Sequence, residues 1–157
     1  MRDLPKDLHW LLFDLDGTLT DSAPGILRCV QYALEQCGTP EPDTHKLRPF
    51  IGPPLLDSFQ QFCGMSPERA AYAVAQYRER FSKIGMFENS VYPGIPQLLE
   101  RLTAHGHVLA VATPKPEVYT RQIMEHFAPT KSVTVIAGSD IQKEGQTTAD
   151  GMRLAPR

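Results

Sequence analysis

The sequence predicts an α/β protein: a three-layer, Rossmann-like parallel sheet with a block of helices inserted after the first strand. Short, continuously apolar segments alternate with segments of helical periodicity, and such apolar runs are typical of strands buried on both faces. Because helices separate these strands, we expect the sheet to be parallel. The long stretch between the first two strands, residues 22–90, carries no strand signal and is predicted to be helical.

The predicted core is discontinuous and comprises residues 1–21 and 91–157. Its first strand is Trp10–Phe13, which ends in a loop that opens with two closely spaced aspartates. A helix with one apolar face follows residue 94 and ends at Gly106. The remaining predicted elements are, in order, a strand over 107–112, a helix over 117–127 and a strand over 133–137.

Within the inserted block, the residue types that flank the apolar segments predict where helices begin and end. Asp21 or Ser22 can cap the first helix, which Gly38 ends. Ser66 precedes a proline at the first helical position, and this helix is predicted to reach about Ile84. The block is therefore expected to contain several short helices.

The composition excludes several classes of protein. The chain has 157 residues, enough to bury a core without disulfides or a metal, and 41% of them are hydrophobic. Sixteen Lys and Arg oppose eighteen Asp and Glu, and the net charge of -2 argues against a nucleic-acid partner. No apolar run approaches the roughly 20 residues that span a bilayer, and the N-terminus lacks the apolar centre of a secretory signal. We therefore expect a cytoplasmic protein that binds neither nucleic acid nor membrane, with its three cysteines reduced and buried.

Polar residues follow the first two core strands, at the edge where an open parallel sheet binds its ligands. Asp14 and Asp16 come directly after the first strand, and Thr113 ends the second. Two carboxylates at spacing i, i+2 face the same way and repel each other, so we predict that both bind a hard divalent cation, Mg²⁺. Gly17 lets the chain turn close to a ligand, and Thr18 offers a hydroxyl to that turn or to the ligand.

The segment Phe13–Ser22, with its Asp-Leu-Asp-Gly-Thr run, resembles the first motif of the haloacid dehalogenase superfamily. The resemblance implies that Asp14 is the nucleophile that takes a phosphoryl group. It also implies that Asp16 is the general acid and base, which protonates the leaving oxygen and then activates water. An acid at this second position points to phosphoryl transfer rather than dehalogenation. Such a reaction passes through an aspartyl phosphate, which splits hydrolysis into two steps.

Further segments extend the resemblance over about residues 9–140 and point to the phosphoglycolate phosphatase-like branch. Thr113 matches the second motif, whose hydroxyl would hold a phosphate oxygen. Lys115 lies in a segment similar to the family's Ser-Lys-Pro segment and would approach the phosphate. The block 22–90 resembles the family's helical cap, in which Arg48 would contact an anionic group of the substrate.

These resemblances imply a Mg²⁺-dependent phosphatase that hydrolyses a small phosphorylated metabolite, either phosphoglycolate-like or a nucleoside monophosphate. Two alternatives stay open. A phosphomutase of the same superfamily would share Asp14 and Asp16. A non-catalytic chain of the same architecture would act in binding or dimerisation.

The sequence departs from the family after Asp140. The family carries a later lysine and then a fourth strand whose acidic end completes the metal site, whereas here Lys143 comes early and no apolar strand follows Ile136. We therefore expect an incomplete core, as in a truncated member, with a mobile polar tail or a short helix from about Thr148. Trp10–Phe13 would then form an unpaired apolar edge, which favours low solubility or homodimerisation. Weak metal binding and weak or absent turnover are expected for the same reason.

Overall fold

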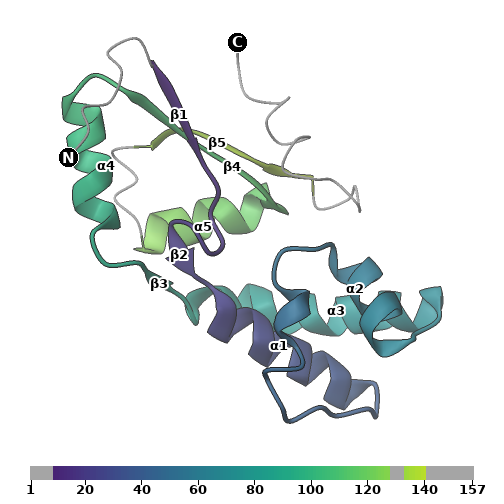
Figure 1. Ribbon diagram of the computed structural model, residues 1–157. Helices are drawn as coiled ribbons and strands as arrows, with labels where there is room; N and C mark the ends of the chain where they lie inside the picture. The colour runs from purple at the N-terminus through teal and green to yellow at the C-terminus, as the bar shows by residue number, and fades with distance from the viewer. Residues whose placement is uncertain (1–8, 128–132, 141–157) are drawn as a thin grey trace. The chain divides into compact units, whose positions relative to one another are not determined.

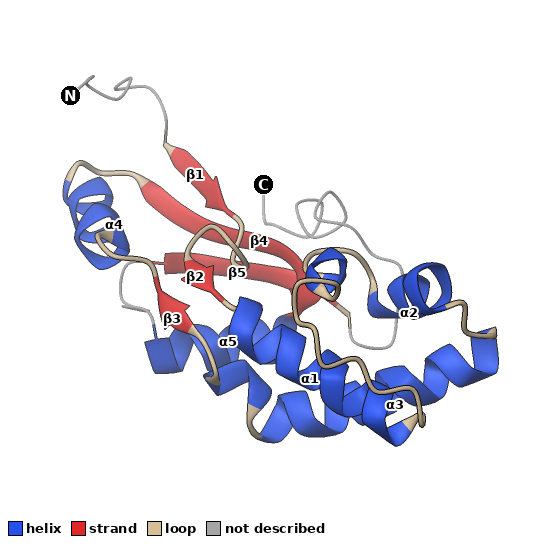
Figure 2. Ribbon diagram, turned by 60° about the horizontal axis from the view of Figure 1, so that its bottom comes forward, coloured by secondary structure: helices blue, strands red, loops and turns tan. Residues whose placement is uncertain are grey.

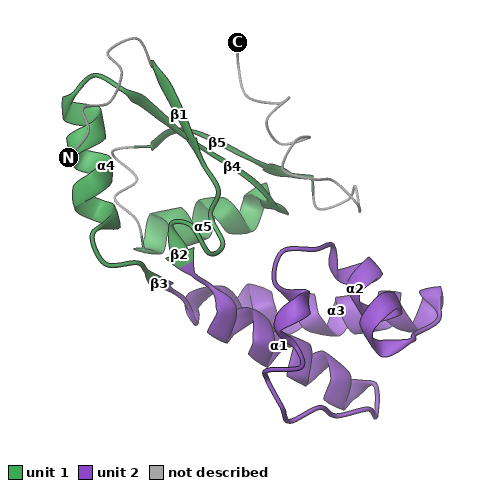
Figure 3. Ribbon diagram, in the orientation of Figure 1, with its two compact units in different colours: residues 1–20, 91–157 green, residues 21–90 purple. Residues whose placement is uncertain are grey.

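The computed structural model describes residues 9–127 and 133–140. The chain divides into two compact units, residues 1–20 with 91–157 and residues 21–90 (Figure 3). The expectations for the tail beyond Asp140 lie outside the described residues. Within the described part of the chain, none of the helices combines the length and apolar composition that a membrane span requires.

The first unit contains a small parallel sheet in the order β1-β4-β5 (Figure 1). Leu12 of β1 pairs with Ala110 of β4, which in turn pairs with Val135 of β5. The predicted parallel α/β sheet is confirmed, and β4 and β5 extend beyond their predicted ends. The strands are β1 (Trp10–Phe13), β4 (Val108–Pro116) and β5 (Val133–Ser139).

Two helices connect these strands, α4 (Ile95–Ala104) before β4 and α5 (Glu117–Phe127) between β4 and β5. Both crossovers step in the same direction across the sheet, and right-handed connections place their helices on one face. Helix α4 packs against β4, and α5 packs against β4 and β5 (Figure 2). The second helical layer of the expected three-layer fold is not among the described residues.

Strand β1 differs from the prediction of a strand buried on both faces. Trp10 is 42% exposed and Leu12 is 46% exposed, whereas Leu11 and Phe13 are half-buried. Exposure alternates along the strand, so Trp10 and Leu12 lie on its more exposed face and Leu11 and Phe13 on the other. Strand β1 also lies at the edge of the described sheet, with β4 as its described neighbour. The expectation of burial on both faces is wrong within the described structure. The expected unpaired edge depends on residues after Asp140, which lie outside the described residues, and stays a prediction.

The second unit is helical, as predicted. Ser66 caps α3 by accepting a hydrogen bond from the backbone N–H of Arg69, and the helix ends at Lys83, close to the expected end. At the first helix Ser22 is the N-cap residue, but its side chain makes no capping hydrogen bond; Oδ1 of the preceding residue, Asp21, accepts from the N–H of Ala23 instead. The elements are α1 (Ala23–Gln36), η1 (Arg48–Phe50), α2 (Leu55–Cys63), α3 (Pro67–Lys83) and η2 (Gly85–Phe87).

Two features of the chain were missed or misjudged by sequence reasoning. The strands β2 (Thr20–Asp21) and β3 (Ser90–Val91) pair with each other, and two-residue strands leave no periodicity to find. The cysteines are free, as expected, but only Cys29 is buried, whereas Cys37 and Cys63 are partly exposed. Both of the latter stand at helix C-termini, where side chains are less covered than on an interior helix face.

Candidate active site

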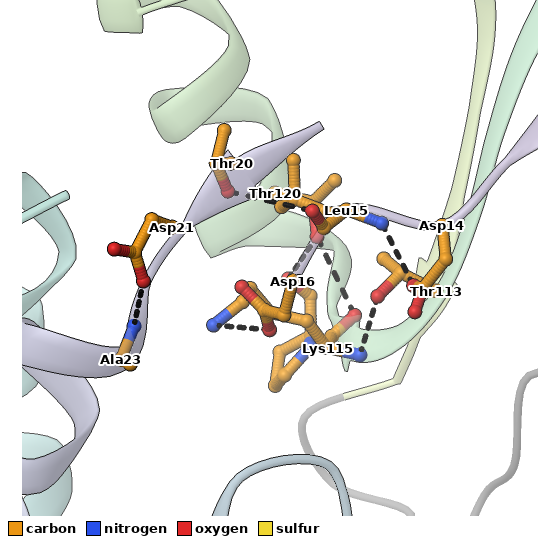
Figure 4. A network of polar contacts seen from close by, with 10 residues as sticks. Asp14, Leu15, Asp16, Thr20, Asp21, Ala23, Thr113, Lys115 and Thr120 are labelled. Carbon is orange, nitrogen blue, oxygen red and sulfur yellow. Dashed lines mark hydrogen bonds and ion pairs between the residues drawn. The ribbon is translucent and has the colours of Figure 1, made fainter. Parts of the chain in front are cut away.

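The site forms where β1 and β4 end side by side. The two strands run in step, with Phe13 opposite Val111, so Asp14 and Thr113 emerge at the same edge of the sheet. Figure 4 shows these two side chains next to each other, with Asp16 beside Lys115. The structure therefore brings together the four residues that the sequence placed at the ends of two separate strands.

The loop after β1 is held by backbone hydrogen bonds around a buried leucine. The carbonyl of Leu15 accepts from the N–H groups of Leu19 at 3.0 Å and Thr20 at 3.1 Å, and its side chain is fully buried. Gly17 occupies a left-handed conformation, with φ +78°, where residues with a Cβ are strained. Thr18 and Gly17 are exposed on this turn. Asp14 is oriented by its own loop, since its Oδ1 accepts from the N–H of Leu15 at 2.8 Å.

Thr113 lies in a bulge of β4. Ala112 pairs with Ala137 and Pro116 with Ser139, so three residues of β4 stand opposite Gly138 alone. The Thr113 side chain is almost fully buried, and its Oγ1 accepts from the N–H of Lys115 at 3.3 Å. Because its oxygen accepts this bond, the hydroxyl hydrogen is left to donate, which suits contact with a phosphate oxygen.

Asp16 and Lys115 form an ion pair that sequence reasoning did not foresee. The Nζ of Lys115 lies 3.0 Å from Oδ2 of Asp16, and the two side chains are 8% and 17% exposed. The other oxygen of Asp16, Oδ1, is buried and has no hydrogen-bond partner among the described residues. A buried carboxylate oxygen without a donor is costly in free energy. Binding of a proton or a cation at this oxygen would therefore stabilise the site.

The residues fit a hard divalent cation in part. Asp14 and Asp16 offer carboxylate oxygens, which are the ligands that Mg²⁺ prefers, and no described residue bonds to Oδ1 of Asp16. Among the described residues there is no group of three or more His, Cys, Asp or Glu side chains able to hold a metal. The predicted ligand pair is therefore compatible with Mg²⁺, with most of its coordination left to water or phosphate.

Arg48 belongs to a different compact unit from the other predicted site residues. It begins η1 in the unit 21–90 and is exposed. Its contact with substrate stays a prediction.

The chain belongs to the haloacid dehalogenase-like hydrolase family, whose model matches residues 11–148. It is 51% identical over 141 residues to a 5'-nucleotidase of Pseudomonas aeruginosa, covering 90% of this chain and 64% of that protein. It is 40% identical over 129 residues to the tyrosine-protein kinase PtkA of Mycobacterium tuberculosis, covering 82% and 44%. The fold matches a predicted phosphatase from Clostridium acetobutylicum with a TM-score of 0.88 at 43% identity, covering 94% and 68%. The chain thus spans less than two thirds of the length of these two curated relatives.

Proposed function

We propose that the site transfers the phosphoryl group of a small phosphomonoester to Asp14 and then to water. The observation that supports this most strongly is the convergence of one nucleophilic carboxylate, one acid, one hydroxyl donor and one cation at the ends of β1 and β4. These are the groups that a dianionic phosphate needs for attack, proton transfer and charge neutralisation. Membership of a hydrolase family adds support.

In the proposed first step, a carboxylate oxygen of Asp14 attacks phosphorus and the bond to the leaving oxygen breaks. Asp16 donates a proton to that oxygen, so the product leaves as an alcohol. In the second step Asp16 takes a proton from water, which attacks the aspartyl phosphate and releases inorganic phosphate. Thr113 and Lys115 place a hydroxyl and an ammonium near the transferred group. Bound Mg²⁺, held by Asp14 and Asp16, would reduce the repulsion between the phosphate and these acids.

For the substrate we favour a nucleoside monophosphate over a phosphoglycolate-like ester. The support is the 51% identity to a protein named 5'-nucleotidase. Arg48 is the candidate contact for an anionic group of either substrate. We also propose a cytoplasmic location, as expected from the sequence.

The test is Mg²⁺-dependent hydrolysis of p-nitrophenyl phosphate by the chain, with EDTA as the metal-free condition. We expect a low rate that needs Mg²⁺ and that Asp14→Asn abolishes, because an amide oxygen is a far poorer nucleophile. Asp43→Asn is the matched control, since Asp43 is exposed and its side chain accepts a local hydrogen bond from the N–H of His45. Nucleoside monophosphates and phosphoglycolate are then compared by kcat/KM.

Two outcomes would replace the proposal. Turnover of a sugar phosphate only in the presence of its bisphosphate would identify a phosphomutase. Absence of turnover together with failure to bind beryllium fluoride, which mimics the phosphoryl group on Asp14, would favour the non-catalytic alternative.

A further inference from the structure

The bulge of β4 over residues 113–115 carries two of the site's functional groups, the hydroxyl of Thr113 and the ammonium of Lys115. Residues of the neighbouring elements α5 and β5 contact this bulge. Register returns at Pro116, so the extra residues must loop out of the sheet between two fixed points. A looped backbone needs support to keep its side chains in one place. The described structure supplies that support from α5 and from β5.

The support from α5 is Thr120, which is fully buried. Its hydroxyl lies 3.2 Å from the carbonyl oxygen of Pro116 and 3.5 Å from that of Lys115. One hydroxyl hydrogen can serve either acceptor, so Thr120 ties the end of the bulge to the first turn of the helix.

The support from β5 is Gly138. A Cβ at this position would lie 2.5 Å from Cα of Glu117, 2.6 Å from its N and 2.7 Å from the carbonyl oxygen of Lys115. All three are backbone atoms, which cannot rotate away as the end of a side chain can. Only a glycine therefore allows β5 to approach the bulge this closely.

We propose that Thr120 and Gly138 are positioning residues for the candidate active site, which act through Lys115. They set the place of the Lys115 backbone, whose N–H binds Oγ1 of Thr113 and whose ammonium binds Asp16. Neither residue was singled out by the sequence, and neither needs to touch substrate. This inference rests on the proposed function for its catalytic meaning, but its structural claim can be tested without any substrate.

The first test uses the backbone amide signals of the ligand-free chain in ¹⁵N NMR. We expect Thr120→Val, which removes the hydroxyl and keeps the shape, to shift the Asp16 amide, and Thr120→Ser to restore it. In a Lys115→Met background, Thr120→Val should leave the Asp16 amide in place, because the link through the ammonium is gone. Thr103→Val is the matched control, since the hydroxyl of Thr103 likewise binds a carbonyl four residues earlier, on α4.

The second test is functional. Gly138→Ala must displace backbone of the bulge, and a misplacement of about 1 Å can cost about 100-fold in rate. We expect kcat for p-nitrophenyl phosphate to fall about 10- to 100-fold, and the dissociation constant for inorganic phosphate to rise. Gly38→Ala is the control, because Gly38 has φ +72° and open space around it, so the substitution strains the backbone of the other compact unit.

The outcomes separate the two claims. An unchanged Asp16 amide in Thr120→Val would overturn the positioning role, whether or not the chain turns over substrate. An inactive wild-type chain whose Asp16 amide responds as expected would contradict the proposed function and leave the positioning role standing. If Gly138→Ala does not fold, the Thr120 pair of variants decides the question alone.

Discussion

Two carboxylates, one in each compact unit, have opposite surroundings. Glu88, in the unit 21–90, accepts from Nη1 of Arg80 at 2.7 Å, from Nη2 of Arg80 at 3.2 Å and from Arg28 at 2.8 Å. Within the part of the chain that the structure describes, Asp16, in the other unit, has one cationic partner at 3.0 Å and a buried oxygen with no hydrogen-bond partner. Both side chains are similarly covered, 19% and 17% exposed, so burial does not explain the difference.

The difference separates a stabilising group from a reactive one. The hydrogen bonds from Arg80 hold the pKa of Glu88 below its ordinary value, and Arg28 adds to this against the opposing effect of burial. Both oxygens of Glu88 thus accept charge-assisted hydrogen bonds, which stabilise the fold. An unsaturated carboxylate costs stability, and its free oxygen is available to a proton, a cation or a substrate. We therefore expect substitutions at the two positions to affect different properties.

The largest expected effect is on turnover at Asp16. Asp16→Asn keeps an oxygen for Lys115 but removes the acid, so kcat for p-nitrophenyl phosphate should fall by about 10²–10⁴-fold. Two effects on the free energy of unfolding oppose each other: Lys115 loses its charged partner, and the buried anionic oxygen to which no described residue donates is removed. The net change, measured with urea, should therefore stay within about 1 kcal/mol of wild type. If the variant unfolds readily while its folded fraction keeps full activity, Asp16 is a stabilising residue and not the reactive one.

The next effect is on stability at Glu88. Glu88→Gln leaves the half-buried guanidinium of Arg80 without its charged partner, and we expect a loss of about 1–3 kcal/mol in the free energy of unfolding. The control is Glu79→Gln, whose pair with Lys83 is exposed, with an expected change of no more than about 0.5 kcal/mol. Equal losses from the two variants, measured in urea, would show that the Arg80–Glu88 pair contributes no more to the free energy of unfolding than the exposed Glu79–Lys83 pair.

The pH dependence sharpens the same contrast. Because the pKa of Glu88 is lowered in the folded chain, its ion pairs contribute fully above the unfolded value of about 4.3. This contribution is lost as the pH falls through the lowered folded value. The stability difference between wild type and Glu88→Gln should therefore be full at about pH 7 and shrink towards about pH 3. A difference that stays constant in urea titrations across this range would contradict the assignment.

The smallest effect concerns the edge of the sheet, through which we propose that two copies of the chain pair. Leu12→Lys places a charge on an edge strand and should reduce self-association, with little loss of stability because Leu12 is already 46% exposed. Ile84→Lys, at a 53% exposed apolar residue of the other unit, is the control. Size-exclusion chromatography over a range of concentrations measures both. A wild-type chain that stays monomeric throughout would exclude edge pairing.

Sequence reasoning succeeded where the signal is local. The apolar runs predicted β1, β4 and β5, and the Ser66-Pro67 pair predicted the start of α3, because strand burial and helix capping depend on adjacent residues. The spacing of Asp14 and Asp16 after a strand was enough to locate a candidate site. The burial of β1 was misjudged. An apolar run shows that a strand favours burial, but it does not show which elements pack on each face of the sheet.

The amino-acid order alone therefore determined the class of fold, the family and the place of the two aspartates, since these follow from periodicity and from one compact motif. The tertiary structure decided which groups meet. It paired Lys115 with Asp16 and left one oxygen of that carboxylate without a donor among the described residues. It also packed Gly138 and Thr120 against the bulge. Such contacts join residues from different strands and helices, and their distances depend on strand register and close packing, which no single segment of the sequence encodes.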